Sequence, residues 1–411
     1  MDGAGNQGPR RGLPRSVWAL GLVSLFMDMS SEMIHGLLPI FLVGTLGVSA
    51  FALGLIEGVA EATASITKIF SGVISDRWGK RKPLILLGYG MAALTKPMFP
   101  LAGSALTVFA ARFLDRVGKG IRGAPRDALV ADVTPVAQRG AAYGLRQSLD
   151  TVGAFAGPLL AIGLMVGLAF DVRQVFWVAC IPALLTIFVL VVGVQEPAHV
   201  PKQAASRNPF ADFRMGDYPR EFWALVVLVL MFTLMRFSEA FLVLRARDAG
   251  LSTPWIPLTL VVMSATYLLT AYPAGKLSDR ISRHLLLAIG CVVMLAADLV
   301  LAFAPSLGWV MAGIALWGVH MGLTEGLIAA LTADYAPAGL RGTAFGVVNL
   351  ARGVMLLVAS ALAGGLWSLY GAVATFATGA ILAVASAVMA LAMRSRSSDT
   401  PGALTGSRDP G

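Results

Sequence analysis

Long apolar stretches recur along almost the whole chain, and they constrain its fold more than any other feature of the sequence. A helix of about 20 mostly apolar residues crosses a bilayer core about 30 Å thick. Only 13% of the 411 residues are charged, which is too few to cover the surface of a soluble protein of this length. We therefore predict an all-α polytopic membrane protein. The sequence predicts about twelve transmembrane helices, at residues 16–44, 50–71, 83–102, 105–130, 139–167, 174–194, 222–245, 255–274, 284–304, 308–331, 341–367 and 371–393.

The distribution of lysine and arginine predicts how the chain is threaded through the membrane. These residues gather in short segments between apolar stretches, as in cytoplasmic loops, and do not form the basic stripe that binds nucleic acid. If the N-terminus is cytoplasmic, the outer loops hold only Arg173, Arg245 and Arg247. We therefore predict a multi-pass protein of the cell (inner) membrane, with both termini in the cytoplasm and no nucleic-acid partner.

One long polar segment separates two groups of six predicted helices. Residues 195–221 are polar and contain several prolines, so we interpret them as a cytoplasmic linker. The predicted organisation is a cytoplasmic N-tail, a first six-helix half, the linker, a second six-helix half and a cytoplasmic C-tail. These parts cover residues 1–15, 16–194, 195–221, 222–393 and 394–411.

The two halves repeat each other in sequence. ALVADVTPVAQRGAAYG at 128–144 aligns with ALTADYAPAGLRGTAFG at 330–346, and GVISDRW at 72–78 aligns with GKLSDRI at 275–281. Repeated halves with the same orientation are typical of secondary transporters whose substrate site lies at the repeat interface. The sequence therefore predicts a transporter of small molecules.

The segment GVISDRWGKRKPL at 72–84 resembles the loop signature of the major facilitator superfamily, Gly-x-Leu-x-Asp-Arg-x-Gly-Arg-Lys. It lies between the second and third predicted helices, where that family carries it, and a degenerate copy lies between the eighth and ninth. The resemblance extends over essentially the whole chain and implies the major facilitator fold, with twelve helices in two repeated halves. It also implies gating roles for Gly72, Asp76, Arg77, Gly79, Lys80, Asp279 and Arg280. The alternative is a solvated loop that only sets the topology.

A second resemblance concerns the direction of transport. GAFAGPLLA at 153–161 resembles the helix-5 signature of antiporters in the family, Gly-x-x-x-Gly-Pro-x-x-Gly-Gly. Gly153, Gly157 and Pro158 match, whereas Ala161 and Ile162 replace the last two glycines. The resemblance implies antiport and hence export. The alternative is ordinary packing of small residues between membrane helices.

Three ionisable residues lie in the first apolar stretch, in FMDMSSEMIHG at 26–36. Helical spacing places Asp28, Glu32 and His35 on one face. Charges within the bilayer are costly and usually face a cavity or one another. A carboxylate in a partly dry cavity can take up and release a proton, so we predict that these three residues couple transport to a proton gradient. A sodium site would need further oxygen ligands, and a structural hydrogen-bond cluster is the alternative to either.

Other charged residues of the first half are predicted to line a substrate cavity. These are Glu57, Glu61, Arg112, Arg146 and Asp150. The predicted helix at 105–130 carries a basic stripe, whose inner members Arg122 and Arg126 are predicted to join the gate by meeting Asp76 and Asp132. For Arg146 the alternative is an internal ion pair with Asp150, one turn away.

The second half holds fewer charges within its apolar stretches, namely Arg236, Glu239, Asp298, His320, Glu325 and Arg352. In the alignment of the repeats, Arg352 takes the place of Asp150, so the charge changes sign. We therefore predict that the first half binds the coupling ion and that the second half mainly shapes the substrate site.

The predicted function is proton-driven antiport that exports a small organic molecule by alternating access. The alternative within transporters is proton- or sodium-coupled uptake of an anionic solute, favoured by Arg112, Arg116 and Arg146. A membrane enzyme or a sensor is a further alternative, but the sequence contains no HExxH-like motif and no long soluble segment. No cofactor and no metal site are predicted. The expected partners are the substrate and the lipid bilayer, and the protein is expected to be a monomer.

Overall fold

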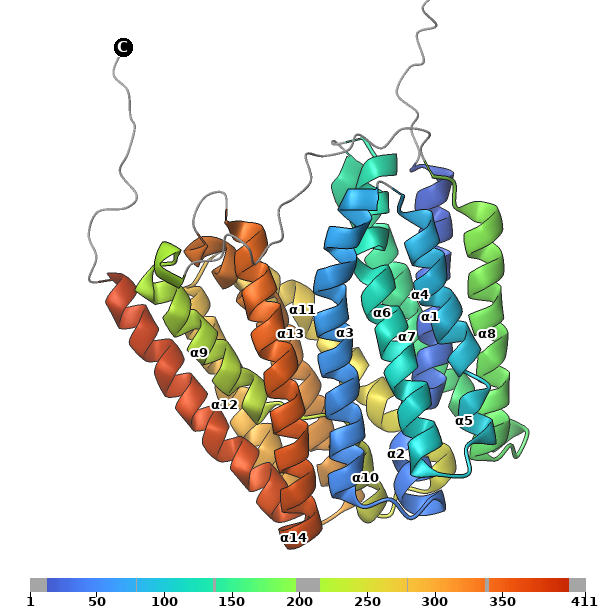
Figure 1. The fold of residues 1–411 in the computed structure, drawn as a ribbon. Coiled ribbons are helices and arrows are strands. Elements are labelled where there is room, and N and C mark those ends of the chain that lie inside the picture. Colours follow the sequence, from blue (N-terminus) through green and yellow to red (C-terminus); the bar gives the residue numbers. More distant parts are fainter. Residues whose placement is uncertain are drawn as a thin grey trace, which may run out of the picture. The chain divides into compact units, whose positions relative to one another are not determined.

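A computed structural model describes residues 13–78, 80–135, 138–196, 215–278, 280–336 and 340–398, apart from the side chains of Val73, Asp76, Arg77, Arg341, Gly342 and residues 395–398. Helices make up nearly all of this part of the chain, and it contains no strand (Figure 1). The helices are α1 (Arg15–His35), α2 (Leu38–Ile40), the π-helix η1 (Phe41–Thr45), α3 (Ala50–Trp78), α4 (Lys82–Thr95), α5 (Met98–Leu101), α6 (Ala105–Val133), α7 (Arg139–Gly167), α8 (Val172–Gly193), the 3₁₀ turn η3 (Met215–Asp217), α9 (Arg220–Met235), α10 (Ala240–Asp248), the 3₁₀ turn η4 (Thr253–Trp255), α11 (Leu258–Ser278), α12 (Arg283–Phe303), α13 (Leu307–Tyr335) and α14 (Arg341–Ser398).

The described residues account for the twelve predicted spans. Ten helical segments are long and apolar enough to cross a membrane. One of them, Thr343–Arg394, contains two spans because α14 turns sharply at Gly371, where φ is 79° and ψ is −174°. Only glycine adopts this backbone conformation without strain. The remaining span is α6, which has 29 residues but carries too many charges to qualify by composition.

The structure corrects three predicted helices, which are interrupted rather than continuous. The interruptions follow His35 in 16–44, Thr95 in 83–102 and Met235 in 222–245. After Thr95 the cause is visible in the sequence, because Pro97 lacks a backbone N–H and disfavours a helical residue before it. Averaged over a helix length, each of the three segments remains apolar despite the polar residues at its break, so the apolar pattern predicted one helix at each place.

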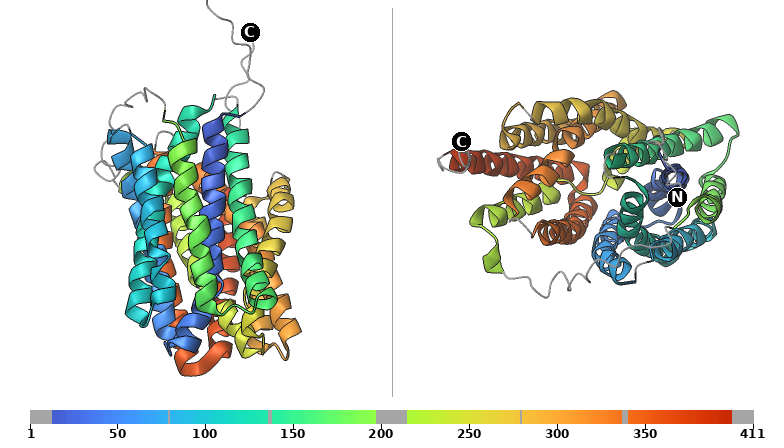
Figure 2. Two further views of the ribbon diagram at one scale, coloured as in Figure 1. Left: turned by 90° about the vertical axis from the view of Figure 1, so that its right-hand side faces the viewer. Right: turned by 90° about the horizontal axis from the view of Figure 1, so that it is seen from above.

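The chain divides into two compact units, each with its own packed interior. The first comprises Met1–Leu46 and Thr63–Asn208, and the second comprises Gly47–Ala62 and Pro209–Gly411. In the first unit α1 stands between α7 and α8, and α4 packs against α6 (Figure 2). In the second unit α9 packs against α14, α11 against α13, and α12 against both α13 and α14.

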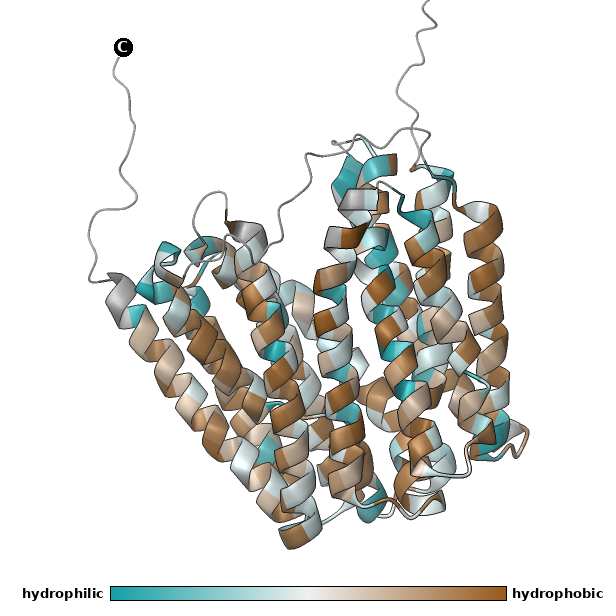
Figure 3. Ribbon diagram, viewed as in Figure 1, coloured by the Kyte–Doolittle hydropathy of each residue, from teal (hydrophilic) through white to brown (hydrophobic). Residues whose placement is uncertain are grey.

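The surfaces of the helices are arranged for a lipid environment. Large apolar side chains are exposed along α8, which is mostly hydrophobic, whereas hydrophilic residues recur along α6 (Figure 3). On α6, Arg112, Asp115, Arg116 and Arg122 are buried while Leu106 is exposed. Apolar residues outside and charged residues inside suit a helix in a bilayer, where exposed charge is costly. The protein is therefore an integral, multi-pass membrane protein.

Two glycines bring α7 into direct contact with α1. A Cβ atom added at Gly153 would lie 2.3 Å from the carbonyl oxygen of Leu25, and one at Gly157 would lie 2.6 Å from that of Met29. Neither position can hold a larger side chain unless the helices move apart. The predicted helix-5 motif is thus a close-packing surface, and the helix that it contacts carries Asp28 and Glu32.

Candidate functional site

A polar network in the first unit is centred on Arg126 of α6 and connects four helices. The Arg126 guanidinium donates hydrogen bonds to Ser24 Oγ on α1 (3.0 Å) and to the Tyr89 hydroxyl on α4 (3.3 Å), and its Nε lies 3.3 Å from Asp127 Oδ1. The guanidinium of Arg122 lies over the Tyr89 ring, 4.5 Å from its centroid. Cation–π contact and hydrogen bonding therefore hold both arginines against α4.

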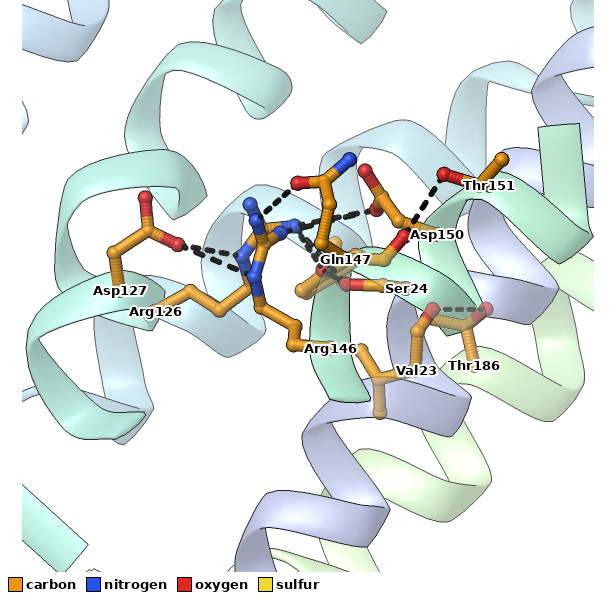
Figure 4. A network of polar contacts seen from close by, with 10 residues as sticks. Val23, Ser24, Arg126, Asp127, Arg146, Gln147, Asp150, Thr151 and Thr186 are labelled. Atoms are coloured by element: carbon orange, nitrogen blue, oxygen red, sulfur yellow. Dashed lines mark hydrogen bonds and ion pairs between the residues drawn. The ribbon is translucent and has the colours of Figure 1, made fainter. Parts of the chain in front are cut away.

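Two carboxylates each lie near two guanidinium groups at this network (Figure 4). Arg146 of α7 is 3.9 Å from Oδ1 of Asp127 and 3.9 Å from Oδ1 of Asp150, while Arg126 lies 4.0 Å from Asp150 Oδ1. Arg146 is nearly buried and donates to Gln147 Oε1, but its Nε and Nη1 have no hydrogen-bond partner among the described residues. Loose ion pairs of this kind can exchange partners when one carboxylate changes its charge.

The carboxyl group of Asp28 on α1 faces that of Asp150 on α7. The two are close enough to share a hydrogen bond, and Lys119 and Arg122 lie near enough to act on Asp28 electrostatically. Two carboxyl groups in contact favour a state in which one proton lies between them, because two like charges at this distance repel. The two carboxyl groups therefore lie next to a cluster of basic side chains.

Glu32 and His35 continue the same face of α1. Glu32 is half-buried, and its Cβ would lie 3.0 Å from a Cβ atom at Gly157. His35 Nδ1 is 2.9 Å from Nη2 of Arg112. The structure thus connects two of the predicted coupling residues to two predicted cavity residues, Asp28 to Asp150 and His35 to Arg112.

Lys96 is a buried ionisable residue that our sequence analysis did not single out. It directly follows α4 and is 2% exposed, and its Nζ lies 3.1 Å from Asp115 Oδ1 and 3.0 Å from Ser31 Oγ. The available signal was a Lys-Pro pair within an apolar stretch, TKPMF at 95–99. Asp115 also lies 4.0 Å from Arg116 Nε, so one carboxylate compensates two cations.

Ion pairs at the repeated loops are equivalent in the two units. Arg81 Nε lies 3.0 Å from Asp132 Oδ2 and Arg81 Nη1 donates to Ser75 Oγ, while in the second unit Arg283 pairs with Asp334, the repeat counterpart of Asp132. Asp132 is thus bound by Arg81 rather than by the basic stripe of α6. Each pair joins the start of one helix to the end of another.

The other predicted gate residues are placed as follows. Gly72 lies on α3 and faces Ala124 of α6, whereas Lys80 and Arg280 are exposed. Arg122 and Arg126 belong to the network around Tyr89. The side chains of Asp76 and Arg77, and all of Gly79 and Asp279, lie outside the described residues.

Glu57 and Glu61 lie on the part of α3 that belongs to the second unit. Glu57 is buried and Glu61 is half-buried. This part of α3 packs closely on α14, because a Cβ atom at Gly54 would lie 2.2 Å from the Ser360 carbonyl oxygen and one at Gly58 would lie 2.9 Å from Leu357 Cα. The segment of α3 that carries the two glutamates is therefore part of the packing of the second unit.

The second unit has its own charged cluster. Arg236, at the break between α9 and α10, donates a hydrogen bond to Glu325 Oε1 on α13. Nη2 of Arg352 on α14 lies 3.5 Å from the same oxygen. Two helices and the break between α9 and α10 thus contribute to one ion-pair cluster, whereas the sequence showed these residues only as separate charges.

Two repeated sets of membrane helices, each with buried ionisable groups of its own, are typical of a membrane transporter rather than an enzyme. The chain belongs to the Major Facilitator Superfamily, whose family model matches residues 20–360 and 243–410. The predicted fold, with twelve helices in two repeated six-helix halves, is confirmed.

Known relatives agree with this assignment. The chain is 32% identical over 389 residues to the uncharacterized MFS-type transporter MJ1317 of Methanocaldococcus jannaschii, covering 93% of this chain and 95% of that protein. It is 30% identical over 172 residues to the multidrug resistance protein MdtH of Yersinia enterocolitica, covering 42% and 41%. A crystal structure of a POT family transporter in complex with a thioalcohol conjugated peptide has the same fold, with a TM-score of 0.80, 14% identity, and coverage of 96% and 98%.

Proposed function

We propose that the protein is a proton-coupled antiporter that exports a small organic molecule. The observation that carries the proposal is the Asp28–Asp150 carboxyl pair beside Arg126 and Arg146. A proton bound to this pair lowers its negative charge and weakens its hold on both arginines, so protonation and the packing of α1, α6 and α7 are linked. Resemblance to MdtH over part of the chain, and the Gly153–Pro158 motif, support export.

In this proposal protons enter the cell as substrate leaves. Glu32 and His35, further along the same face of α1, extend the path from the carboxyl pair to Arg112. The membrane potential contributes about 2.3 kcal/mol per charge per 100 mV, so one proton suffices for modest export against a gradient. We place the protein in the cell (inner) membrane as a monomer, with both termini in the cytoplasm. No cofactor takes part.

The direct test is proton movement in inside-out vesicles with an acidic interior. Addition of a panel of lipophilic cations, neutral drugs and organic anions is expected to release protons with at least one compound. Asp28→Asn and Asp150→Asn should each abolish this release, and Glu32→Gln should reduce it, because the proton site or its path is lost. Asp217→Asn, an exposed carboxylate before α9, is the control and should behave like the wild type. Unchanged release in Asp28→Asn and Asp150→Asn, at normal expression, would refute the coupling site.

Uptake of an anionic solute together with protons is the second candidate. It is favoured by Arg122 and Arg146, whose buried guanidinium nitrogens include some without a hydrogen-bond partner among the described residues. The same vesicles distinguish the two functions. An added substrate that enters with protons acidifies the interior further, whereas antiport makes it less acidic.

A further inference from the structure

The break between α9 and α10 places an arginine inside the second unit. Residues 236–239 are not helical, and Arg236 follows the last helical residue, Met235. Its side chain is 16% exposed and is bound by Glu325 of α13. Glu239, on the other side of the break, adds a second negative charge that acts on Arg236. The charge of Arg236 is therefore compensated from two sides.

Arg352 of α14 is much less completely compensated. Its side chain is 32% exposed and lies 3.5 Å from Glu325 Oε1, which Arg236 already occupies. Among the described residues it forms no hydrogen bond. A guanidinium group has five N–H donors in a planar fork that fits a carboxylate or phosphate. Arg352 therefore keeps donors and positive charge for a further anionic partner.

The surroundings of Arg352 suit recognition of a small anionic group. Glu325 holds the two arginines at one oxygen, and the Tyr267 hydroxyl of α11 is near enough to interact with both Glu325 and Arg236. Three helices of one unit and the break between α9 and α10 therefore converge here. Arg352 now shares the Glu325 carboxylate with Arg236. A bound anion would give Arg352 charge-assisted hydrogen bonds of its own, and these are stronger than hydrogen bonds between neutral groups.

The repeat sharpens the contrast with the first unit. Arg352 occupies the position that Asp150 occupies in α7. In the first unit that position holds an acid, which faces Asp28, and in the second it holds a base with an incomplete partner. The same position of the repeat thus carries a group that can bind a proton in the first unit and a group that can bind an anion in the second.

We propose that Arg352 binds the carboxylate, sulfonate or phosphate group of a small organic solute, and that this group identifies the transported substrate class. The proposal rests on the proposed transport function and adds the chemistry of its substrate. The membrane potential, which is negative inside the cell, also favours export of an anion. It therefore favours both proton entry and anion exit.

Binding is tested on the purified full-length protein in neutral detergent by its thermal unfolding temperature. The probes are phenylacetate, benzenesulfonate and phenyl phosphate, with phenylacetamide as the uncharged match. The anions are expected to raise the unfolding temperature in a concentration-dependent way, and the amide is not. Arg352→Gln should weaken anion binding by about tenfold or more, since it removes a charge-assisted contact.

Arg352→Gln and Glu325→Gln should change the affinity for anions in opposite directions. An ion cluster with only a structural role would not show this contrast. Glu325→Gln removes the competing carboxylate and should tighten anion binding by about tenfold. Arg247→Gln removes an exposed guanidinium of the same unit and should change nothing. Arg352→Lys keeps the charge without the fork and should bind anions with intermediate affinity, which keeps the test valid if Arg352→Gln fails to fold.

Several results would overturn the proposal. The first is that the amide stabilises the protein as much as the anions do, and the second is that Glu325→Gln binds anions more weakly. The third is stabilisation by phosphatidylglycerol in lipid nanodiscs but by none of the soluble anions. That result would assign Arg352 to a lipid headgroup. Because binding is measured without a proton gradient, the outcome is independent of the vesicle experiment. Anion binding with no proton release would contradict the antiport function and leave this site in place.

Discussion

Replacement of Asp115 by asparagine is expected to cost about 3–5 kcal/mol in the free energy of unfolding, the usual result when one partner of a buried ion pair is removed. Lys96 would keep Ser31 as its hydrogen-bond partner but would lose the Asp115 carboxylate at 3.1 Å. Arg116, 4.0 Å from the same carboxylate, would lose that negative charge as well. Lys96→Met should cost less, because Asp115 would still face Arg116.

The pair is isolated by a double-mutant cycle measured by thermal unfolding in detergent. Lys96→Met combined with Asp115→Asn should be more stable than the sum of the single losses predicts, by at least 1 kcal/mol, because no unpaired charge remains at Lys96. Arg283→Gln is the matched control, since its pair with Asp334 is 34% and 51% exposed. An exposed pair contributes about 0–1 kcal/mol. Equal costs at Asp115 and Arg283 would show that the Lys96–Asp115 pair is hydrated rather than buried.

The apolar stretches predicted the number of spans because burial of a helix in lipid depends mainly on composition and length. The predicted boundaries failed at the breaks after His35, Thr95 and Met235. An average of hydropathy over a whole span does not register these breaks, because one or two polar residues such as Lys96 or Arg236 leave the segment apolar.

Helical spacing placed Asp28, Glu32 and His35 on one face, and the structure retains that arrangement within α1. Spacing along one helix does not identify the partner on another helix, so the pairing of Asp28 with Asp150 required the contact of α1 with α7. The repeat was more informative. It related Asp150 to Arg352, and the structure shows that both lie in charged clusters of their own units.

Lys96 is a residue whose role the sequence could not predict. A single lysine in an apolar stretch resembles a residue near a span end whose ammonium group reaches the interface. Only the position of Asp115 on α6 turns it into a buried ion pair. The identity of the third or fourth member of a polar cluster depends on which helices are neighbours, and the sequence of one helix does not contain that information.

Gly157→Ala is expected to destabilise the protein by about 1–3 kcal/mol, the usual cost of overpacking a tight interface. The new methyl group would lie 2.6 Å from the Met29 carbonyl oxygen, and backbone cannot move aside as a flexible side chain can. α1 must therefore shift away from α7. Because Asp28 is on α1 and Asp150 is on α7, the same shift separates the two carboxyl groups.

Gly163→Ala is the matched control on the same helix, where no atom lies within 4 Å of the added Cβ. It should leave the protein unchanged or more stable by about 0.5–1 kcal/mol, since alanine favours a helix more than glycine does. Thermal unfolding measures the change in stability. Proton release in inside-out vesicles measures the effect of separating the Asp28 and Asp150 carboxyl groups. If the motif serves only packing, proton release by Gly157→Ala should fall no further than the amount of folded protein does. If the contact also sets the carboxyl pair, release should be lost from the protein that remains folded, and Gly153→Ala, one turn away against Leu25, should behave in the same way.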